Sequence, residues 1–249
     1  MDAAQTRAIF RDVKSEVGPT GRRALLAGAV LAFVGFLGLV GGTLQHHGLG
    51  VDQGARELVG LARVTGLDIP MQTVSILGDR SGMIPLIALA SLLVWQYRRR
   101  WVLAVPIIML GTGGLQLLAK WAVNRPRPDL APWGFPSGHV LSLVVFFGLI
   151  AYFLYVLGID RRWQWLGRGV GAGVVLAVAF SRLYLDVHWL SDVVGGFTLG
   201  LAYLLVTLWL LESGRHRSVS TETAASFVPV IPATGCGDPA SDCEVPSPA

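Results

Sequence analysis

Six apolar segments, separated by short polar stretches, constrain what this chain can fold into. The first, residues 24–44, carries no charged side chain over 21 residues. At 1.5 Å per helical residue, a segment of this length crosses about 30 Å, the thickness of the hydrocarbon core of a bilayer. The apolar segment of a cleaved signal peptide would be only about 7–15 residues long. We therefore expect residues 24–44 to form an uncleaved first membrane span.

Five further segments are expected to span the membrane. The second span stops at three consecutive arginines, residues 98–100, and the third ends at Lys120. The fifth is short unless it also takes in residues 183–185, because the charged segment 160–168 precedes it. The expected spans after the first are residues 82–97, 102–119, 137–157, 169–180 and 190–211.

Residues 45–80, between the first two spans, have a mixed composition. Apolar side chains recur at helical spacing from Val51 to Ala62, while Asp52 and Arg56 fall on other faces. This pattern suits a short helix lying along the membrane surface, and a connecting helix packed on the bundle would show the same pattern. We therefore predict an all-α fold: a six-transmembrane-helix bundle with a short interfacial helix between the first two spans.

Composition supports a membrane protein over a soluble one. The chain is 53% apolar and only 14% charged, with a mean hydropathy of +0.57. A soluble domain would carry about a quarter charged residues. The net charge of +4 and the pI near 9.4 would also suit a nucleic-acid-binding protein. The basic residues follow the predicted membrane topology instead, so we expect no nucleic-acid partner.

The basic residues are distributed unequally between the two ends of the predicted spans. Six spans place both termini on the same side, and 13 of the 20 Lys and Arg residues lie on that side. Cytoplasmic loops carry an excess of Lys and Arg. We therefore expect a multi-pass protein of the cell membrane with both termini in the cytoplasm. The opposite, outer face then carries Lys120, Arg127 and Arg182.

Two terminal segments flank the predicted membrane domain, residues 24–212. Residues 1–23 are polar and basic, and we expect them in the cytoplasm. Residues 213–249 are dominated by Ser, Thr, Ala and Pro, which is typical of a disordered tail. The tail contains Cys236 and Cys243, which have no histidine at zinc-binding spacing, so free thiols are expected.

Three polar clusters occur at span ends on the expected outer face. The first two flank a loop in which four prolines within about eleven residues forbid a continuous helix. The third crosses the junction of the fifth and sixth spans. The clusters are Lys120 with Arg127-Pro128, then Pro136-Ser137-Gly138-His139, and finally Ser181-Arg182 with His188 and Asp192.

The residue types in these clusters suit the binding of a phosphate group. Lys120, Arg127 and Arg182 offer several hydrogen-bond donors and no acceptor, as a dianion requires. Ser137 and Gly138 begin a helix, whose free N–H groups and positive dipole end attract phosphate oxygens. Glycine also lets a ligand approach the backbone closely. We therefore expect these five residues to bind phosphate.

The third cluster also contains a candidate nucleophile. His188 and Asp192 are four residues apart, so on a helix they share a face and can form a hydrogen bond. A carboxylate on one imidazole nitrogen fixes the tautomer and leaves the other nitrogen to attack. His139, close to the bound anion, would donate a proton to the leaving oxygen. His188, Asp192 and His139 are therefore the candidate catalytic residues.

Each cluster also has a simpler interpretation. A basic pair beside a membrane often contacts lipid headgroups, and a single histidine at a boundary is often structural. His188 and Asp192 are also compatible with metal binding, but no third and fourth ligand occur at a fixed spacing, so no metal is expected. Arg125 would bind phosphate, or face solvent or headgroups. Asp186 is a candidate ion-pair partner of Arg182.

Together the three clusters resemble the signature of the type 2 phosphatidic acid phosphatase (PAP2) superfamily, which also includes the vanadium haloperoxidases. The resemblance covers about residues 82–211. It implies a six-helix membrane phosphatase that uses no metal or other cofactor. His188 would form a phosphohistidine, Asp192 would orient it and His139 would be the general acid. The phosphate would be held by Lys120, Arg127, Ser137, Gly138 and Arg182.

The sequence thus predicts an integral membrane phosphatase acting on a lipid phosphate or lipid pyrophosphate at the outer membrane face. Phosphatidate, phosphatidylglycerol phosphate and undecaprenyl pyrophosphate all fit. Two alternatives remain: a lipid phosphotransferase with the same site, and a non-catalytic membrane transporter or scaffold. Transporters usually place polar groups near the membrane midplane, whereas these lie at span ends. The expected partners are the lipid substrate and the bilayer, with the oligomeric state left open.

Overall fold

The computed structural model describes residues 17–45, 50–64, 66–97 and 99–226. Within these ranges the chain forms eight α-helices, one short 3₁₀ helix, η1 (Arg99–Trp101), and no strand, which confirms the all-α prediction. The helices are α2 (Pro19–Gln45), α3 (Gly50–Leu61), α4 (Asp68–Ile76), α5 (Arg80–Tyr97), α6 (Ala104–Val123), α7 (Gly138–Val156), α8 (Arg161–Tyr184) and α9 (Leu190–Ser226).

The described helices are long and apolar enough to cross a membrane five or six times. Five of them, α2, α6, α7, α8 and α9, meet the length and hydropathy of a span individually. The pair α4 and α5 meets them jointly, with a bend of 42° at the break between the two helices. The first, third, fourth and sixth expected spans coincide with α2, α6, α7 and α9, and α5 covers the second.

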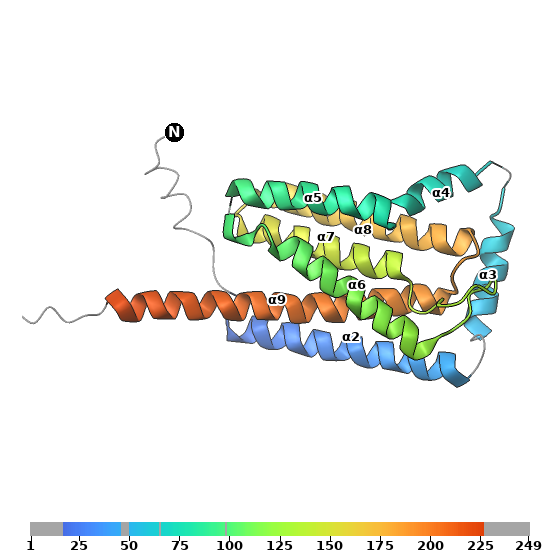
Figure 1. The fold of residues 1–249 in the computed structure, drawn as a ribbon, viewed down its shortest axis with the longest axis horizontal. Coiled ribbons are helices and arrows are strands. Elements are labelled where there is room, and N and C mark those ends of the chain that lie inside the picture. The colour runs from blue at the N-terminus through green and yellow to red at the C-terminus, as the bar shows by residue number, and fades with distance from the viewer. Residues whose placement is uncertain (1–16, 46–49, 65, 98, 227–249) are drawn as a thin grey trace, which may run out of the picture.

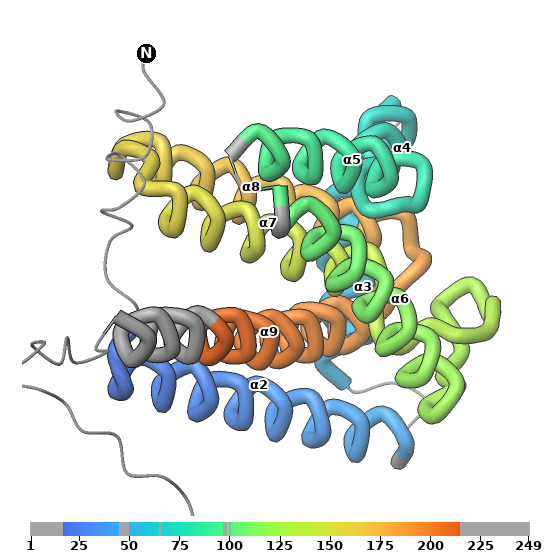
Figure 2. Tube along the Cα trace, turned by 60° about the vertical axis from the view of Figure 1, so that its left-hand side comes forward, coloured from blue at the N-terminus to red at the C-terminus, as the bar shows by residue number. Residues whose placement is uncertain are grey.

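Helix α7 occupies the centre of the bundle and packs against α6, α8 and α9 (Figures 1 and 2). Its sequence carries no charged side chain after His139, and a helix that is apolar on all sides is stable only where neighbours cover it. Helix α9, which packs against α7, also packs along α2. Side chains of α7 that are completely buried include Leu141, Leu143, Val145 and Leu149.

Two glycines of α9 allow this helix to approach the start of α7 closely. A Cβ atom on Gly196 would collide with the main-chain carbonyl oxygen of Ser137. On Gly200, one turn later, it would lie 3.0 Å from the carbonyl oxygen of Leu141. Only glycine permits this backbone-to-backbone distance. The first turns of α7 and α9 are therefore held side by side.

The loops that matter for function lie at one end of the bundle (right-hand side of Figure 1). Here α6 leads into α7, α8 leads into α9, and α3 runs across the ends of the longer helices. Helix α2 begins at the opposite end, where α9 also leaves the bundle. The three polar clusters are consequently carried by the same end of the molecule, as the sequence predicts.

Three expected boundaries differ from the structure. The fifth span was expected at residues 169–180, but α8 has 24 residues and already includes the charged segment after Asp160. Arginine side chains are long enough to reach polar surroundings from a helix end, so they do not terminate it. Two helices, α3 and α4, stand where one interfacial helix was expected. Helix α9 continues past residue 212 to Ser226, and residues 1–16 and 227–249, which include both cysteines, lie outside the described residues.

Candidate active site

The proline-rich loop between α6 and α7 is fixed by backbone hydrogen bonds and one buried ring. Asn124 ends α6 in the left-handed conformation, with φ of 43°, and its N–H bonds the carbonyl oxygen of Lys120. The N–H of Gly134 donates to the carbonyl oxygen of Arg125 over 2.7 Å. Phe135 is completely buried and stacks on Phe36 with ring centroids 5.5 Å apart. The loop therefore presents its arginines from a defined backbone.

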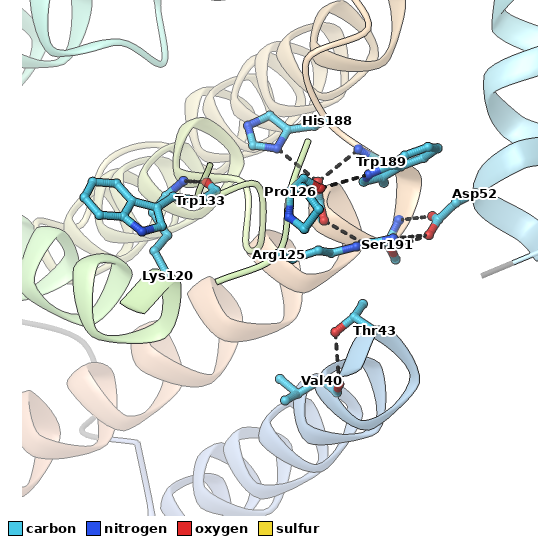
Figure 3. A network of polar contacts seen from close by, with 11 residues as sticks. Val40, Thr43, Asp52, Lys120, Arg125, Pro126, Trp133, His188, Trp189 and Ser191 are labelled. Carbon is cyan, nitrogen blue, oxygen red and sulfur yellow. Dashed lines mark hydrogen bonds and ion pairs between the residues drawn. The ribbon is translucent and has the colours of Figure 1, made fainter. Parts of the chain in front are cut away.

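The predicted phosphate-binding residues surround the end of the bundle that α3 crosses. Lys120, in the last turn of α6, is buried and donates to the carbonyl oxygen of Trp133 over 2.6 Å (Figure 3). Ser137 is the residue before α7, and Gly138 is the first residue of that helix. Arg182 lies in the last turn of α8 and donates to Ser75 Oγ of α4 over 2.6 Å.

A cavity of about 400 Å³ opens between α4 and these residues. It is lined by Arg127, His139 and Arg182 together with side chains of α4 and the neighbouring loops: Gln72, Ser75, Ile76, Asp79 and Leu185. Two of the cationic groups and one candidate catalytic histidine thus face the same space. Gly78, in the break between α4 and α5, lies directly against the His139 side chain, because a Cβ there would be 2.8 Å from the Cβ of His139.

Several buried donors in this region have no hydrogen-bond partner among the described residues. They include Arg127 Nε, Arg182 Nε and Ser137 Oγ. Ser137 is completely buried at the N-cap position of α7, yet its hydroxyl makes no capping bond. Buried polar groups are normally satisfied, so unsatisfied donors mark a place where a ligand's acceptor atoms are expected. Converging N–H and O–H donors suit an anion with several oxygens.

His188 and Asp192 form the predicted pair. His188 Nδ1 lies 3.3 Å from Asp192 Oδ2, and both residues are buried, with exposed fractions of 4% and 0% (Figure 3 shows His188). With Nδ1 facing the carboxylate, Nε2 is the nitrogen left for chemistry. Burial lowers the pKa of His188; the bond to Asp192 opposes this shift, and the charges of Arg182 and Lys120 add to it. On balance this favours the neutral imidazole, the form that the predicted nucleophile requires.

His188 does not line the 400 Å³ cavity. It borders a separate space of about 10 Å³, together with side chains of α3 and of the α8–α9 loop. The second and third clusters are nevertheless connected by the backbone, because the N–H of Ser137 donates to the carbonyl oxygen of Asp192 over 2.9 Å. The structure thus brings the predicted site residues to one end of the bundle, but His188 borders a different space from Arg127, His139 and Arg182.

The sequence missed a buried network around Asp192. Arg125 was expected to bind phosphate or face solvent or headgroups, and Asp52 was assigned to a polar helix face. Both are buried, and Arg125 donates to Asp52 Oδ2 and to Asp192 Oδ1, each over 2.8 Å (Figure 3). Asp52 lies 73 residues before Arg125, so no local spacing could have linked them.

A second correction concerns Asp186. The sequence allowed an ion pair with Arg182, but Asp186 pairs with Arg56 of α3 over 2.6 Å and lies 3.5 Å from Arg63. Asp186 raises the pKa of Arg56 through this bond. Arg182 instead turns toward Ser75 of α4. The cause is the position of α3, which crosses the α8–α9 loop and places Arg56, and Arg63 just after the helix, beside Asp186.

Within the described part of the chain, no group of three or more His, Cys, Asp or Glu side chains has an arrangement that would hold a metal ion.

Comparison with known proteins places this architecture in a family. Residues 101–215 match the model of the PAP2 superfamily. Phosphatidylglycerophosphatase B of Bacillus subtilis is 32% identical over 184 residues, which cover 69% of this chain and 89% of that protein. Undecaprenyl-diphosphatase of Sulfolobus acidocaldarius is 26% identical over 196 residues, covering 74% of this chain and 88% of that protein.

Two solved structures share the fold. The crystal structure of a transmembrane PAP2-type phosphatidylglycerolphosphate phosphatase from Bacillus subtilis aligns with a TM-score of 0.65 at 28% identity, over 74% of this chain and 96% of that one. Aquifex aeolicus LpxE aligns with a TM-score of 0.53 at 18% identity, over 64% of this chain and 96% of that one. At this identity the similarity supports a shared fold and nothing further. This chain is a multi-pass integral membrane protein and belongs to the PAP2 superfamily.

Proposed function

We propose that this protein is a phosphatase that hydrolyses a lipid phosphate or lipid pyrophosphate through a phosphohistidine at His188. The observation that carries the proposal is the buried His188, whose Nδ1 lies 3.3 Å from the Asp192 carboxylate, at the same bundle end as three buried or half-buried cations. The names of the relatives support the substrate class, since one is a phosphatidylglycerophosphatase and another an undecaprenyl-diphosphatase.

In the first step, Nε2 of His188 attacks phosphorus and the bond between phosphorus and the leaving oxygen breaks. His139 gives its proton to that oxygen, so that a neutral lipid alcohol or a protonated lipid monophosphate departs. The imidazole keeps its proton on Nδ1 and becomes positively charged, and the carboxylate of Asp192 stabilises this charge. In the second step, water attacks phosphorus, His139 takes a proton from it, and inorganic phosphate and neutral His188 result.

The remaining site residues hold the transferred group. Phosphoryl transfer depends mostly on positioning and on stabilising charge on the three equatorial oxygens. Lys120, Arg127 and Arg182 supply positive charge, and the unsatisfied Arg127 Nε, Arg182 Nε and Ser137 Oγ supply directed donors. The N–H groups at the start of α7, beginning at Gly138, add the positive end of a helix dipole.

The test is phosphate release by the full-length protein in detergent, from phosphatidylglycerol phosphate, phosphatidate and undecaprenyl pyrophosphate, with and without EDTA. We expect release from at least one lipid in EDTA, and its loss in His188→Ala. The control is His216→Ala, which replaces a histidine outside the three clusters, 28 residues after His188 in the chain. Brief reaction with ³²P-labelled substrate should give an acid-labile, alkali-stable protein label that His188→Ala lacks. Full activity in His188→Ala would refute the proposal, and transfer to a lipid acceptor in place of water would refute hydrolysis.

We further propose that both termini face the cytoplasm and that the site faces outward. The excess of Lys and Arg on the side of the termini supports this orientation. So does the fold, in which α2 begins at the end opposite to the site loops (Figure 1). An alkaline phosphatase reporter inserted at residue 130 should be active outside the cell, and one fused to the C-terminus should be inactive. The reverse result would invert the topology.

A further inference from the structure

We propose that Asp52 and Arg125 are positioning residues for the phosphoryl transfer: Arg125 fixes Asp192 against His188, and Asp52 fixes Arg125 and balances its charge. The inference rests on the phosphatase function proposed above. Neither residue belongs to the three sequence clusters, and Asp52 lies on α3, outside residues 101–215 that match the superfamily model.

The contacts form a continuous chain of side chains (Figure 3). One terminal nitrogen of Arg125, Nη2, donates to Asp52 Oδ2 over 2.8 Å, and the other, Nη1, donates to Asp192 Oδ1 over 2.8 Å. The Arg125 side chain is 3% exposed and both carboxylates are fully buried. Ser191 completes the network, since its N–H and Oγ both donate to Asp52 over 2.7 Å.

These contacts determine how the Asp192 carboxylate is oriented. Its Oδ1 accepts from Arg125, while its Oδ2 accepts from the main-chain N–H of Trp189 over 3.0 Å and faces His188 Nδ1. Rotation about the side chain would break the bond to Arg125 and the bond to Trp189 together. Arg125 therefore keeps Oδ2 available to the histidine. The Arg125 guanidinium also lies over the ring of Trp189, 5.6 Å from the ring centroid. Trp189 is the residue that follows His188.

The charges of the network have a role beyond geometry. Asp52, Arg125 and Asp192 together carry a net charge of minus one in a buried place, where charge interactions are strong. This charge favours the positive imidazole that forms when Nε2 bonds to phosphorus. Without the charge of Asp52, Arg125 would cancel Asp192. The network would then be neutral at the moment when the histidine becomes cationic.

Helix α3 and the segment that follows it also hold the backbone that carries His188. Arg56 donates to Asp186 Oδ1 over 2.8 Å and to Oδ2 over 2.6 Å, and Arg63 donates to the carbonyl oxygen of Tyr184 over 3.0 Å. Asp186 lies two residues before His188 in the α8–α9 loop. The charged groups that act on His188 or border its space are Asp192, Asp52, Arg56, Asp186, Lys120 and Arg182.

The first experiment compares Asp52→Asn with Glu57→Gln, which makes the same chemical change at an exposed position of α3. For Asp52→Asn we expect kcat to fall roughly ten- to a hundredfold, as for other groups that orient a catalytic ligand, with KM changed by less than about twofold. Glu57→Gln should match the natural protein. Equal kcat values for the two variants would overturn the inference.

The pH profile separates positioning from simple damage to the fold. Asp52→Asn removes a negative charge, so protonation of His188 becomes harder and the acid limb of kcat/KM should move to lower pH. Arg125→Gln removes a positive charge, so the limb should move to higher pH. Movement in the same direction, or no movement in either variant, would contradict the charge role, because a loosened fold has no reason to shift the two profiles oppositely.

The double variant Asp52→Asn/Arg125→Gln restores the net charge of minus one. We expect its loss of kcat to be smaller than the product of the two single losses, since coupled residues are not additive. Losses that simply multiply would show two independent effects and overturn the inference. If His188→Ala remains active, the proposed function itself fails. If His188→Ala is inactive while Asp52→Asn behaves as Glu57→Gln does, only the positioning role fails.

Discussion

The main-chain N–H of Ser137 donates a hydrogen bond of 2.9 Å to the main-chain carbonyl oxygen of Asp192. This bond joins the residue that precedes α7 to the first turn of α9, so the proposed phosphate-binding helix start and the proposed nucleophile's partner are fixed to each other by backbone. It forms because Gly196 lets α9 reach the carbonyl oxygen of Ser137. Geometry at the site therefore depends on glycines that have no chemical role.

Gly196→Ala should disturb both folding and activity. The new methyl group would meet the carbonyl oxygen of Ser137, a backbone atom that cannot move independently. Overpacking of this kind lowers the free energy of unfolding by about 1–3 kcal/mol. We expect a lower Tm and a reduced kcat, measured by thermal unfolding in detergent and by phosphate release. The matched control is Gly214→Ala in the same helix, where a Cβ meets nothing within 4 Å and Tm should not fall. Equal Tm values for the two variants would contradict this account of the α7–α9 contact.

Ser137→Ala should reduce activity without reducing stability. An N-cap serine usually stabilises its helix by about 1 kcal/mol, but the Ser137 hydroxyl makes no capping bond and has no partner. We therefore expect the Tm of Ser137→Ala to be close to that of the natural protein. If the hydroxyl bonds a charged phosphate, kcat/KM should fall about tenfold. Ser91→Ala, which removes a hydroxyl bonded only to its own helix, should leave kcat/KM unchanged. A Ser137→Ala variant with natural kcat/KM would remove Ser137 from the phosphate site.

Ser75→Ala should raise KM. Ser75 Oγ accepts a 2.6 Å hydrogen bond from Arg182, which otherwise has an unsatisfied Nε beside the cavity. A hydrogen bond to a charged group contributes about 1.5–3 kcal/mol, so loss of this support should raise KM by about tenfold. The control is Ser81→Ala, whose exposed hydroxyl lies 3.5 Å from Asp79. An unchanged KM in Ser75→Ala would show that α4 does not position Arg182 for substrate.

The titration of His188 should lie below the ordinary histidine pKa of about 6.5. Burial disfavours its charged form, and Arg182 and Lys120 act in the same direction. Neutral His188 should therefore persist as pH falls through 6.5, with its protonation, and the loss of kcat/KM expected of the proposed nucleophile, at lower pH. The unfolded chain takes up this proton earlier than the folded one, so His188 lowers stability as pH falls below 6.5. NMR of the imidazole nitrogens, assigned with His188→Ala, measures the value; a pKa at or above 6.5 would contradict the prediction.

The overall fold was readable from the sequence because it depends on local properties. An uncharged segment such as residues 24–44 is long enough to cross a bilayer whatever its neighbours are, and α2 runs over Pro19–Gln45. The charged start of α8 was misjudged because arginines at a helix end reach polar surroundings without ending the helix. Composition therefore does not fix where a helix begins or ends, because a long charged side chain can lie within the helix and still reach polar surroundings.

The sequence by itself determined the all-α, multi-span architecture and the three clusters, and it paired His188 with Asp192. The helical spacing used for that pairing was not the reason, because His188 lies in the loop before α9 and only Asp192 is on the helix. Only the tertiary structure decided that Arg125 is buried, that it pairs with Asp52, and that Asp186 pairs with Arg56. Those partners lie 73 and 130 residues apart, so only the folded backbone brings each pair of opposite charges together. The spacing of residues along the chain does not predict these ion pairs, because they result from the packing of α3 across the ends of α8 and α9.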